Sequence, residues 1–173
     1  MVVIGAIRVL GSLPVLRWPF VGALIAILVD FSDLFWMNLL RLGGLGDYQA
    51  FDKWIDLVYM STFLIVSLRW SGVEKRVSLA LFGYRMIGIA TFELLQWRGV
   101  LLIFPNVFEF WFVFVAARDQ FKPRYVLTRR RAAAWLAMLL VAKEAQEFIL
   151  HQGKYLDRYR AVDVVVDWWN WVF

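Results

Sequence analysis

The chain has no cysteine among its 173 residues, and it has only one histidine and four prolines. The absence of cysteine excludes disulfide bonds, thiolate nucleophiles and thiolate metal sites. The sequence also lacks the signatures of Ser/His/Asp catalysis, glycine-rich phosphate loops and zinc sites. The chemistry of ordinary soluble enzymes is therefore not indicated.

Charge is scarce as well. Only 19% of the residues are charged, whereas 62% are hydrophobic, 18% are aromatic, and the mean hydropathy is +0.63. A water-soluble domain needs polar residues to cover its surface, whereas a protein solvated by lipid can expose apolar side chains all round. This composition predicts that the bilayer is the solvent.

Five apolar runs are long enough to cross about 30 Å of hydrocarbon. We therefore expect an all-α integral membrane protein, a single polytopic domain over residues 1–173 built as a compact bundle of five transmembrane helices. An N-terminal and a C-terminal amphipathic helix, the latter at about 156–173, are expected to lie in the membrane interfaces. The predicted spans are approximately 18–40, 51–70, 77–97, 100–117 and 129–150.

Lysine and arginine are distributed unevenly among the predicted loops, and six of them fall within 118–131. The positive-inside rule then predicts a cytoplasmic N-terminus and, with five spans, a C-terminus on the outer side. The expected partners are membrane lipids, with anionic headgroups at the 118–131 loop. We expect no nucleic-acid binding.

Seven carboxylates lie inside these apolar stretches, although a carboxylate in hydrocarbon costs several kcal/mol unless it is paired, protonated or hydrated. Counted at about 1.5 Å per residue along helices of alternating direction, all seven fall in the outer half. They outnumber the bases at that depth, so we expect either protonated carboxyls or a bound cation. The alternative is that the charges only pair between helices. The predicted ligand-binding residues are Asp30, Asp33, Asp56, Arg85, Glu93, Asn106, Glu109, Lys143, Glu144 and Glu147.

Two local patterns suggest metal chemistry. Glu144, Glu147 and His151 would share one helix face and could ligate a metal ion or relay a proton. Asp52 and Asp56 resemble the DxxxD spacing of membrane prenyltransferases. That resemblance implies magnesium and a diphosphate-bearing lipid.

Three functions remain open from the sequence. The first is an acidic intramembrane cavity that binds or conducts a cation, a proton or a cationic amphiphile, with assembly as a homo-oligomer. The second is a membrane-embedded enzyme that acts on an isoprenoid or other lipid, with Glu93, Glu109 and Glu144 as candidate catalytic acids and bases. The third is a structural or accessory subunit of a larger membrane complex.

Overall fold

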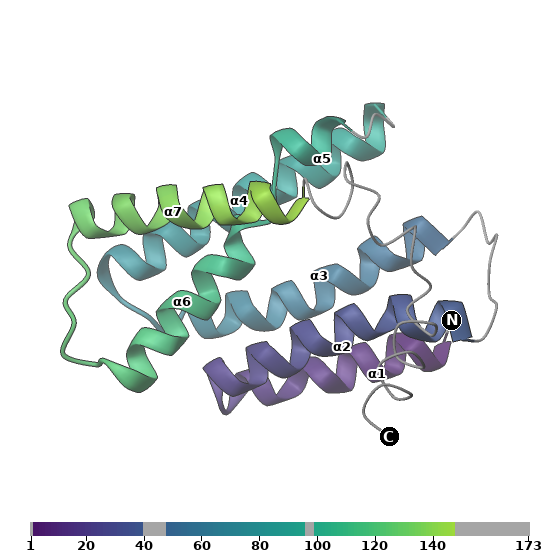
Figure 1. Ribbon diagram of the computed structural model, residues 1–173, viewed down its shortest axis with the longest axis horizontal. Helices are drawn as coiled ribbons and strands as arrows, with labels where there is room; N and C mark the ends of the chain where they lie inside the picture. Colours follow the sequence, from purple (N-terminus) through teal and green to yellow (C-terminus); the bar gives the residue numbers. More distant parts are fainter. Residues whose placement is uncertain (1, 40–47, 96–98, 148–173) are drawn as a thin grey trace, which may run out of the picture.

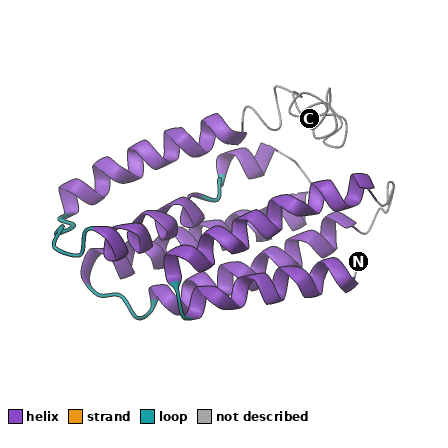
Figure 2. Ribbon diagram, turned by 60° about the horizontal axis from the view of Figure 1, so that its bottom comes forward, coloured by secondary structure: helices purple, strands orange, loops and turns teal. Residues whose placement is uncertain are grey.

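The computed structural model describes residues 2–39, 48–95 and 99–147, and every element in these ranges is helical (Figure 2). The all-α class predicted from the sequence is therefore confirmed for the described residues. Four of the predicted apolar stretches coincide with single helices. The elements are α1 Val2–Ser12, the 3-10 helix η1 Leu13–Leu16, α2 Pro19–Leu39, α3 Tyr48–Ser67, α4 Gly72–Leu95, α5 Gly99–Ile103, α6 Val107–Phe121 and α7 Arg129–Glu147.

The helices form an elongated bundle in which successive passes run in alternate directions, with α5 and α6 together making one pass (Figure 1). The start of α1 lies at the far end from the α6–α7 connection, and α7 runs away from that connection. Thr128 precedes α7 and caps it, because its side-chain oxygen accepts a hydrogen bond from the backbone N–H of Arg131 at 3.4 Å.

The N-terminal segment forms a hairpin with α2. Pro14 lies in η1, and its carbonyl accepts the backbone N–H groups of Arg17 and Trp18 at 3.1 and 2.8 Å. Gly22 lies so close to η1 that a Cβ atom there would be 2.3 Å from the backbone nitrogen of Val15. The N-terminal helix that the sequence predicts for the membrane interface packs as α1 against α2 and α3.

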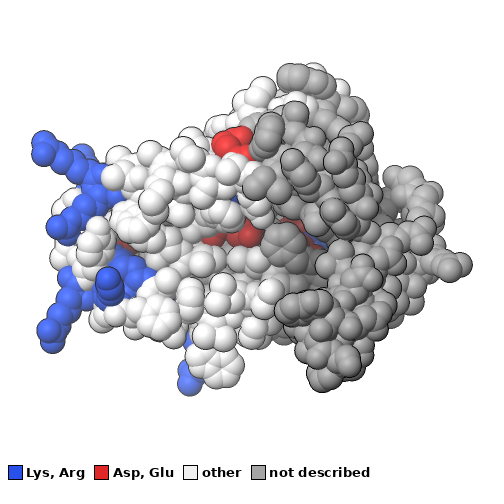
Figure 3. All heavy atoms as spheres, viewed as in Figure 1, with Lys and Arg blue, Asp and Glu red and all other residues white. Residues whose placement is uncertain are grey.

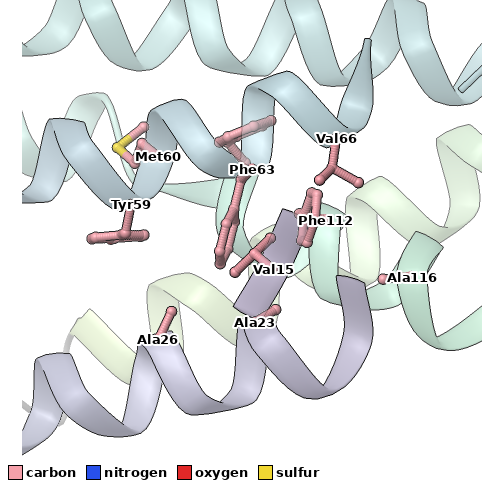
Figure 4. Close-up of a cluster of buried hydrophobic side chains, with 10 residues drawn as sticks. Val15, Ala23, Ala26, Tyr59, Met60, Phe63, Val66, Phe112 and Ala116 are labelled. Atoms are coloured by element: carbon pink, nitrogen blue, oxygen red, sulfur yellow. The ribbon is translucent and has the colours of Figure 1, made fainter. Parts of the chain in front are cut away.

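A layer of aromatic rings joins α3 to α6 at the centre of the bundle (Figure 4). Phe63 and Phe112 are both fully buried and stack with ring centroids 4.2 Å apart. Trp111, also fully buried, belongs to a second cluster that includes Leu127 and Ala132 and connects α6 with α7. These rings fix the positions of α3 and α6, the two helices that carry the polar site.

The predicted helix at 100–117 is interrupted. The chain forms α5, leaves helical geometry around Pro105 and Asn106, and starts again as α6. Proline has no backbone N–H and clashes with the carbonyl one turn earlier, so it favours a break at this position.

The length and composition of α4 allow it to cross a membrane. Among the described residues, α4 is the one helix that is long and apolar enough to do this. Shorter apolar segments are found at Gly5–Leu16, Pro19–Asp30 and Ile55–Ser67. The five spans expected from the sequence are not supported by the described residues. The predicted C-terminal helix at 156–173 lies outside the described residues.

Candidate functional site

Three helices meet at Arg8. This side chain of α1 is only 4% exposed, and its Nη2 group pairs with Oδ1 of Asp30 on α2 and with Oδ1 of Asp56 on α3. A guanidinium group carries several donors in a planar fork, so it can hold two carboxylates together. The two acids are therefore compensated by a base that lies 22 and 48 residues away in the sequence.

One turn further along α3, Tyr59 faces α6. Its hydroxyl donates a hydrogen bond to Oε2 of Glu109 at 3.2 Å. The Asn106 amide donates to the same carboxylate oxygen at 3.1 Å and to the Tyr59 hydroxyl oxygen at 3.3 Å. Glu109 thus receives its hydrogen bonds from two neutral groups, in contrast to Asp30 and Asp56.

The break between α5 and α6 lies beside this carboxylate. Arg85 of α4 donates from Nη1 to the carbonyl of Phe104 at 2.9 Å, which satisfies a backbone oxygen near the end of α5. Asn106 is 6% exposed, and its Oδ1 atom is buried without a hydrogen-bond partner in the structure. The chain therefore leaves helical geometry beside Glu109, and one side-chain oxygen of this segment is buried and unpaired.

A buried lysine approaches this group of polar residues from α7. Lys143 on α7 is 7% exposed, donates to Oε1 of Gln146 at 2.9 Å, and lies 5.4 Å from the ring centre of Phe110. Arg85 and Lys143 lie close enough to Glu109 for electrostatic attraction. Asp56 of the Arg8 group and Tyr59 of the Glu109 group are about one turn apart on α3.

The charge balance of these polar residues differs from the sequence expectation. Asp30 and Asp56 pair with Arg8, which comes from the N-terminal helix that was expected in the membrane interface. Arg8 therefore adds a base that the predicted excess of acid did not include. Ion pairs between helices therefore account for the positions of Asp30 and Asp56 in the bundle. The hydrogen-bond partners of Glu109 are neutral, so its position needs another explanation.

Of the other predicted residues, the structure describes the side chains of Glu93 and Glu144. Glu93 lies exposed near the end of α4, and Glu144 is half-buried on α7. The side chains of Asp33 and Glu147 and the whole of His151 lie outside the described residues, so the proposed metal ligation by Glu144, Glu147 and His151 stays a prediction. Within the residues that the structure describes, no cluster of three or more His, Asp or Glu side chains could hold a metal ion.

The aromatic residues near the site take part in packing. Phe108 and Trp111 are fully buried, and the Trp111 indole donates to the Ser78 hydroxyl at 3.1 Å. The Tyr59 ring packs edge-on against Phe63 with centroids 5.5 Å apart. These rings position α3, α4 and α6 around Glu109.

Glycines near the site fulfil different roles. A Cβ atom at Gly88 would lie 2.3 Å from Cβ of Phe104, so this glycine permits the close approach of α4 to the end of α5. Gly83 has no atom within 4 Å of such a Cβ. Gly88, and not Gly83, is therefore required for the contact between α4 and α5 that brings Arg85 close to the break before α6.

The sequence matches no family model, and no curated protein or solved structure is significantly similar to it. The function must therefore be argued from the site itself.

Proposed function

We propose that the protein is a small multi-pass membrane protein whose interior polar site binds or conducts a proton or a small cation at Glu109. The observation that carries the proposal is the arrangement of this carboxylate. It is partly buried, two neutral side chains contact one of its oxygens, and a helix break lies beside it. Membrane proteins use interrupted helices in this way to present polar groups to an ion at the depth of the bilayer.

The distribution of polarity supports the membrane placement. Arg8, Asn106 and Lys143 are buried, whereas many large apolar side chains are exposed. A protein in water rarely has this arrangement, but lipid solvates apolar side chains and favours charges that face the protein interior. Among the most exposed apolar residues are Leu10, Leu28, Leu94, Val126 and Val141.

Helix length supports it as well. The helices α2, α3, α4 and α7 contain 21, 20, 24 and 19 residues. About 20 residues cross the hydrocarbon core. The charges that lower the hydropathy of α2 and α3 include Asp30 and Asp56, which pair with Arg8 inside the bundle. Their presence is compatible with a span.

The hairpin of α1 and α2 changes the proposed orientation. With α1 and η1 as an additional short pass, the chain crosses the bundle an even number of times. The basic α6–α7 connection marks the cytoplasmic side, so the start of α1 and the end of α7 both belong to the outer side. This proposal replaces the cytoplasmic N-terminus expected from the sequence.

The size of the ligand follows from the contacts of Glu109. Tyr59 and Asn106 already occupy one carboxylate oxygen. The unpaired Oδ1 atom of Asn106 is a further oxygen of the kind that a hard cation prefers. A proton or a small cation suits these contacts better than a cationic amphiphile.

Flux through reconstituted liposomes tests the proposal. Protons, Na⁺ and K⁺ are driven in turn by an imposed gradient, and uptake is compared with that of empty liposomes. Glu109→Gln should lower the flux at least about tenfold, and Tyr59→Phe should lower it by about two- to tenfold, since each removes a hydrogen-bonded group. Asp119→Asn, an exposed acid paired with Arg118, is the control and should retain the wild-type rate.

Wild-type liposomes no more permeable than empty ones to all three ions, or a Glu109→Gln variant as active as wild type, would contradict the proposal. The alternative would then be a structural or accessory subunit. The observation that favours that role is the double ion pair of Arg8, which joins three helices without any ligand.

A further inference from the structure

Three connections lie together at one end of the bundle, and each exposes basic side chains. They are the α1–α2 turn with Arg17, the α3–α4 turn with Arg69, and the α6–α7 connection that runs into the first turn of α7. The last of these carries Lys122, Arg124, Arg129 and Arg130, all exposed. We call this end the basic end. Figure 3 shows the lysine and arginine side chains gathered there, away from the acidic side chains near the middle of the molecule.

Contacts between the connections make the basic end one surface. Arg69 donates from Nη1 to the carbonyl of Leu16 at 2.8 Å, which links the α3–α4 turn to the α1–α2 turn. The rings of Phe20 and Phe121, 5.2 Å apart, link the start of α2 to the end of α6. The three connections are therefore held side by side by specific contacts.

The acids that the structure describes at this end are already paired. Glu74 accepts from Arg118 Nη1 at 2.6 Å, and Asp119 accepts from Arg118 Nη2 at 2.5 Å. Arg118 thus forms ion pairs with both carboxylates. The exposed bases of the three connections keep their positive charge facing outward, so the surface attracts anions.

The start of α7 increases this potential. Arg129, Arg130 and Arg131 occupy the first turn, and no acidic residue is present there. The helix dipole is positive at this end, so arginines there add to the positive field where acids would reduce it.

A collar of exposed apolar side chains lies next to the basic residues. Trp18 is 63% exposed and Phe121 is 64% exposed, and Leu68 and Val126 are also exposed. Trp18 and Leu68 adjoin Arg17 and Arg69 in the sequence, and Phe121 adjoins Lys122. A nucleic acid would cover the basic residues and leave this collar in water, whereas a lipid leaflet accommodates both. The start of α4, the candidate span, lies at the same end.

We infer that the basic end binds the phosphate headgroups of an acidic phospholipid leaflet, with the apolar collar entering the acyl region below them. The inference rests on the membrane placement of the proposed function but not on ion binding at Glu109. It extends the interaction from the 118–131 segment to a composite surface made by three separate connections.

The test uses the full chain in an uncharged detergent. Phosphatidylglycerol and phosphatidylcholine with the same acyl chains are titrated separately. Native mass spectrometry counts the retained lipids, and tryptophan fluorescence follows thermal unfolding. Wild type should retain phosphatidylglycerol with at least about tenfold higher apparent affinity than phosphatidylcholine, because each surface cation adds to the attraction. Inorganic phosphate at the same concentration should not reproduce the effect.

Two variants separate charge from folding. The combination Lys122→Gln, Arg124→Gln, Arg129→Gln and Arg130→Gln should lose the preference for phosphatidylglycerol, whereas Arg124→Lys, Arg129→Lys and Arg130→Lys should retain it. These side chains are exposed, so both variants should unfold at the wild-type temperature without lipid. If the four-residue variant does not fold, the pair Arg17→Gln and Arg124→Gln, from two different connections, should reduce the preference.

Three results would overturn the inference. They are equal binding of the two lipids by wild type, an unchanged preference in the glutamine variants, or stronger binding of a single-stranded RNA oligonucleotide than of phosphatidylglycerol. Glu109→Gln should keep the full lipid preference, so a failure of the ion-binding proposal and a failure of this one are distinguishable.

Discussion

At the scale of single residues, Arg8 joins three helices through its ion pairs. It is nearly inaccessible and pairs with carboxylates from two other helices. Nothing in its local sequence indicates this, because its partners lie far along the chain. A buried ion pair gives modest net stability compared with apolar packing, but removing one partner leaves the others uncompensated.

Arg8→Gln should therefore destabilise the protein. We expect a loss of about 3 kcal/mol, the lower end of the range for a broken buried pair, because Asp30 and Asp56 are 36% and 25% exposed. Denaturant titration in mild detergent, followed by tryptophan fluorescence, measures the change. Arg17→Gln, at an exposed position, is the control and should remain within about 0.5 kcal/mol of wild type.

Arg8→Lys gives a further comparison. It keeps the charge but replaces the planar fork with a single ammonium group, so its stability should lie between those of wild type and Arg8→Gln. An Arg8→Gln protein as stable as Arg17→Gln would mean that the three-helix ion pair contributes nothing.

At the scale of elements, two close approaches determine where the polar groups meet. The α1–α2 hairpin closes at Gly22 and brings Arg8 beside Asp30, and the α4–α5 contact at Gly88 brings Arg85 to the break before α6. Both contacts depend on the absence of a side chain. Glycine in a helix is intrinsically unfavourable, so its occurrence at these positions has a packing reason.

Gly22→Ala should destabilise the protein by about 1–3 kcal/mol, because the added Cβ would meet backbone atoms of Pro14 and Val15 at 2.5 and 2.3 Å and the backbone cannot rotate away. Gly83→Ala is the matched control in another helix interior. Its Cβ meets open space, so the substitution should be neutral or stabilising by up to about 1 kcal/mol. Thermal unfolding in detergent compares the two. Equal effects at the two positions would contradict the close packing of the hairpin.

At the scale of the whole molecule, a few polar side chains, among them Arg8, Asn106 and Lys143, are buried beside an apolar and aromatic core. Many large apolar side chains are exposed, and basic residues gather at one end. The helices alternate in direction, so their ends divide into a basic end and the opposite end. In a membrane, these two ends would lie on different sides of the bilayer.

The natural absence of cysteine makes this placement directly testable. In intact cells, a membrane-impermeant maleimide should label Leu95→Cys, at the exposed end of α4, but not Ser71→Cys or Pro123→Cys at the basic end. The latter two should react after permeabilisation. If Ser71→Cys and Leu95→Cys react on the same side, α4 does not cross the membrane and the multi-pass proposal is wrong.

The sequence by itself determined the helical class, the approximate bounds of α2, α3, α4 and α7, and the unusual occurrence of acids within apolar stretches. These properties depend on composition and local periodicity, which are visible along the chain. Depth counting also placed Asp30, Asp56 and Glu109 at a similar level along the bundle axis, and their membership of one shared site stays a prediction.

Only the tertiary structure decided how these groups are paired. The helix period does not say which face meets which neighbour, so the contact of Arg8 with Asp30 and Asp56 could not be read from spacing. For the same reason, the hydrogen bonds of Glu109 with Tyr59 and Asn106, which involve α3 and α6, could not be predicted from the sequence. Side-chain pairing between distant segments depends on close packing in three dimensions, and that packing separates the compensated acids from Glu109, the carboxylate proposed to bind a ligand.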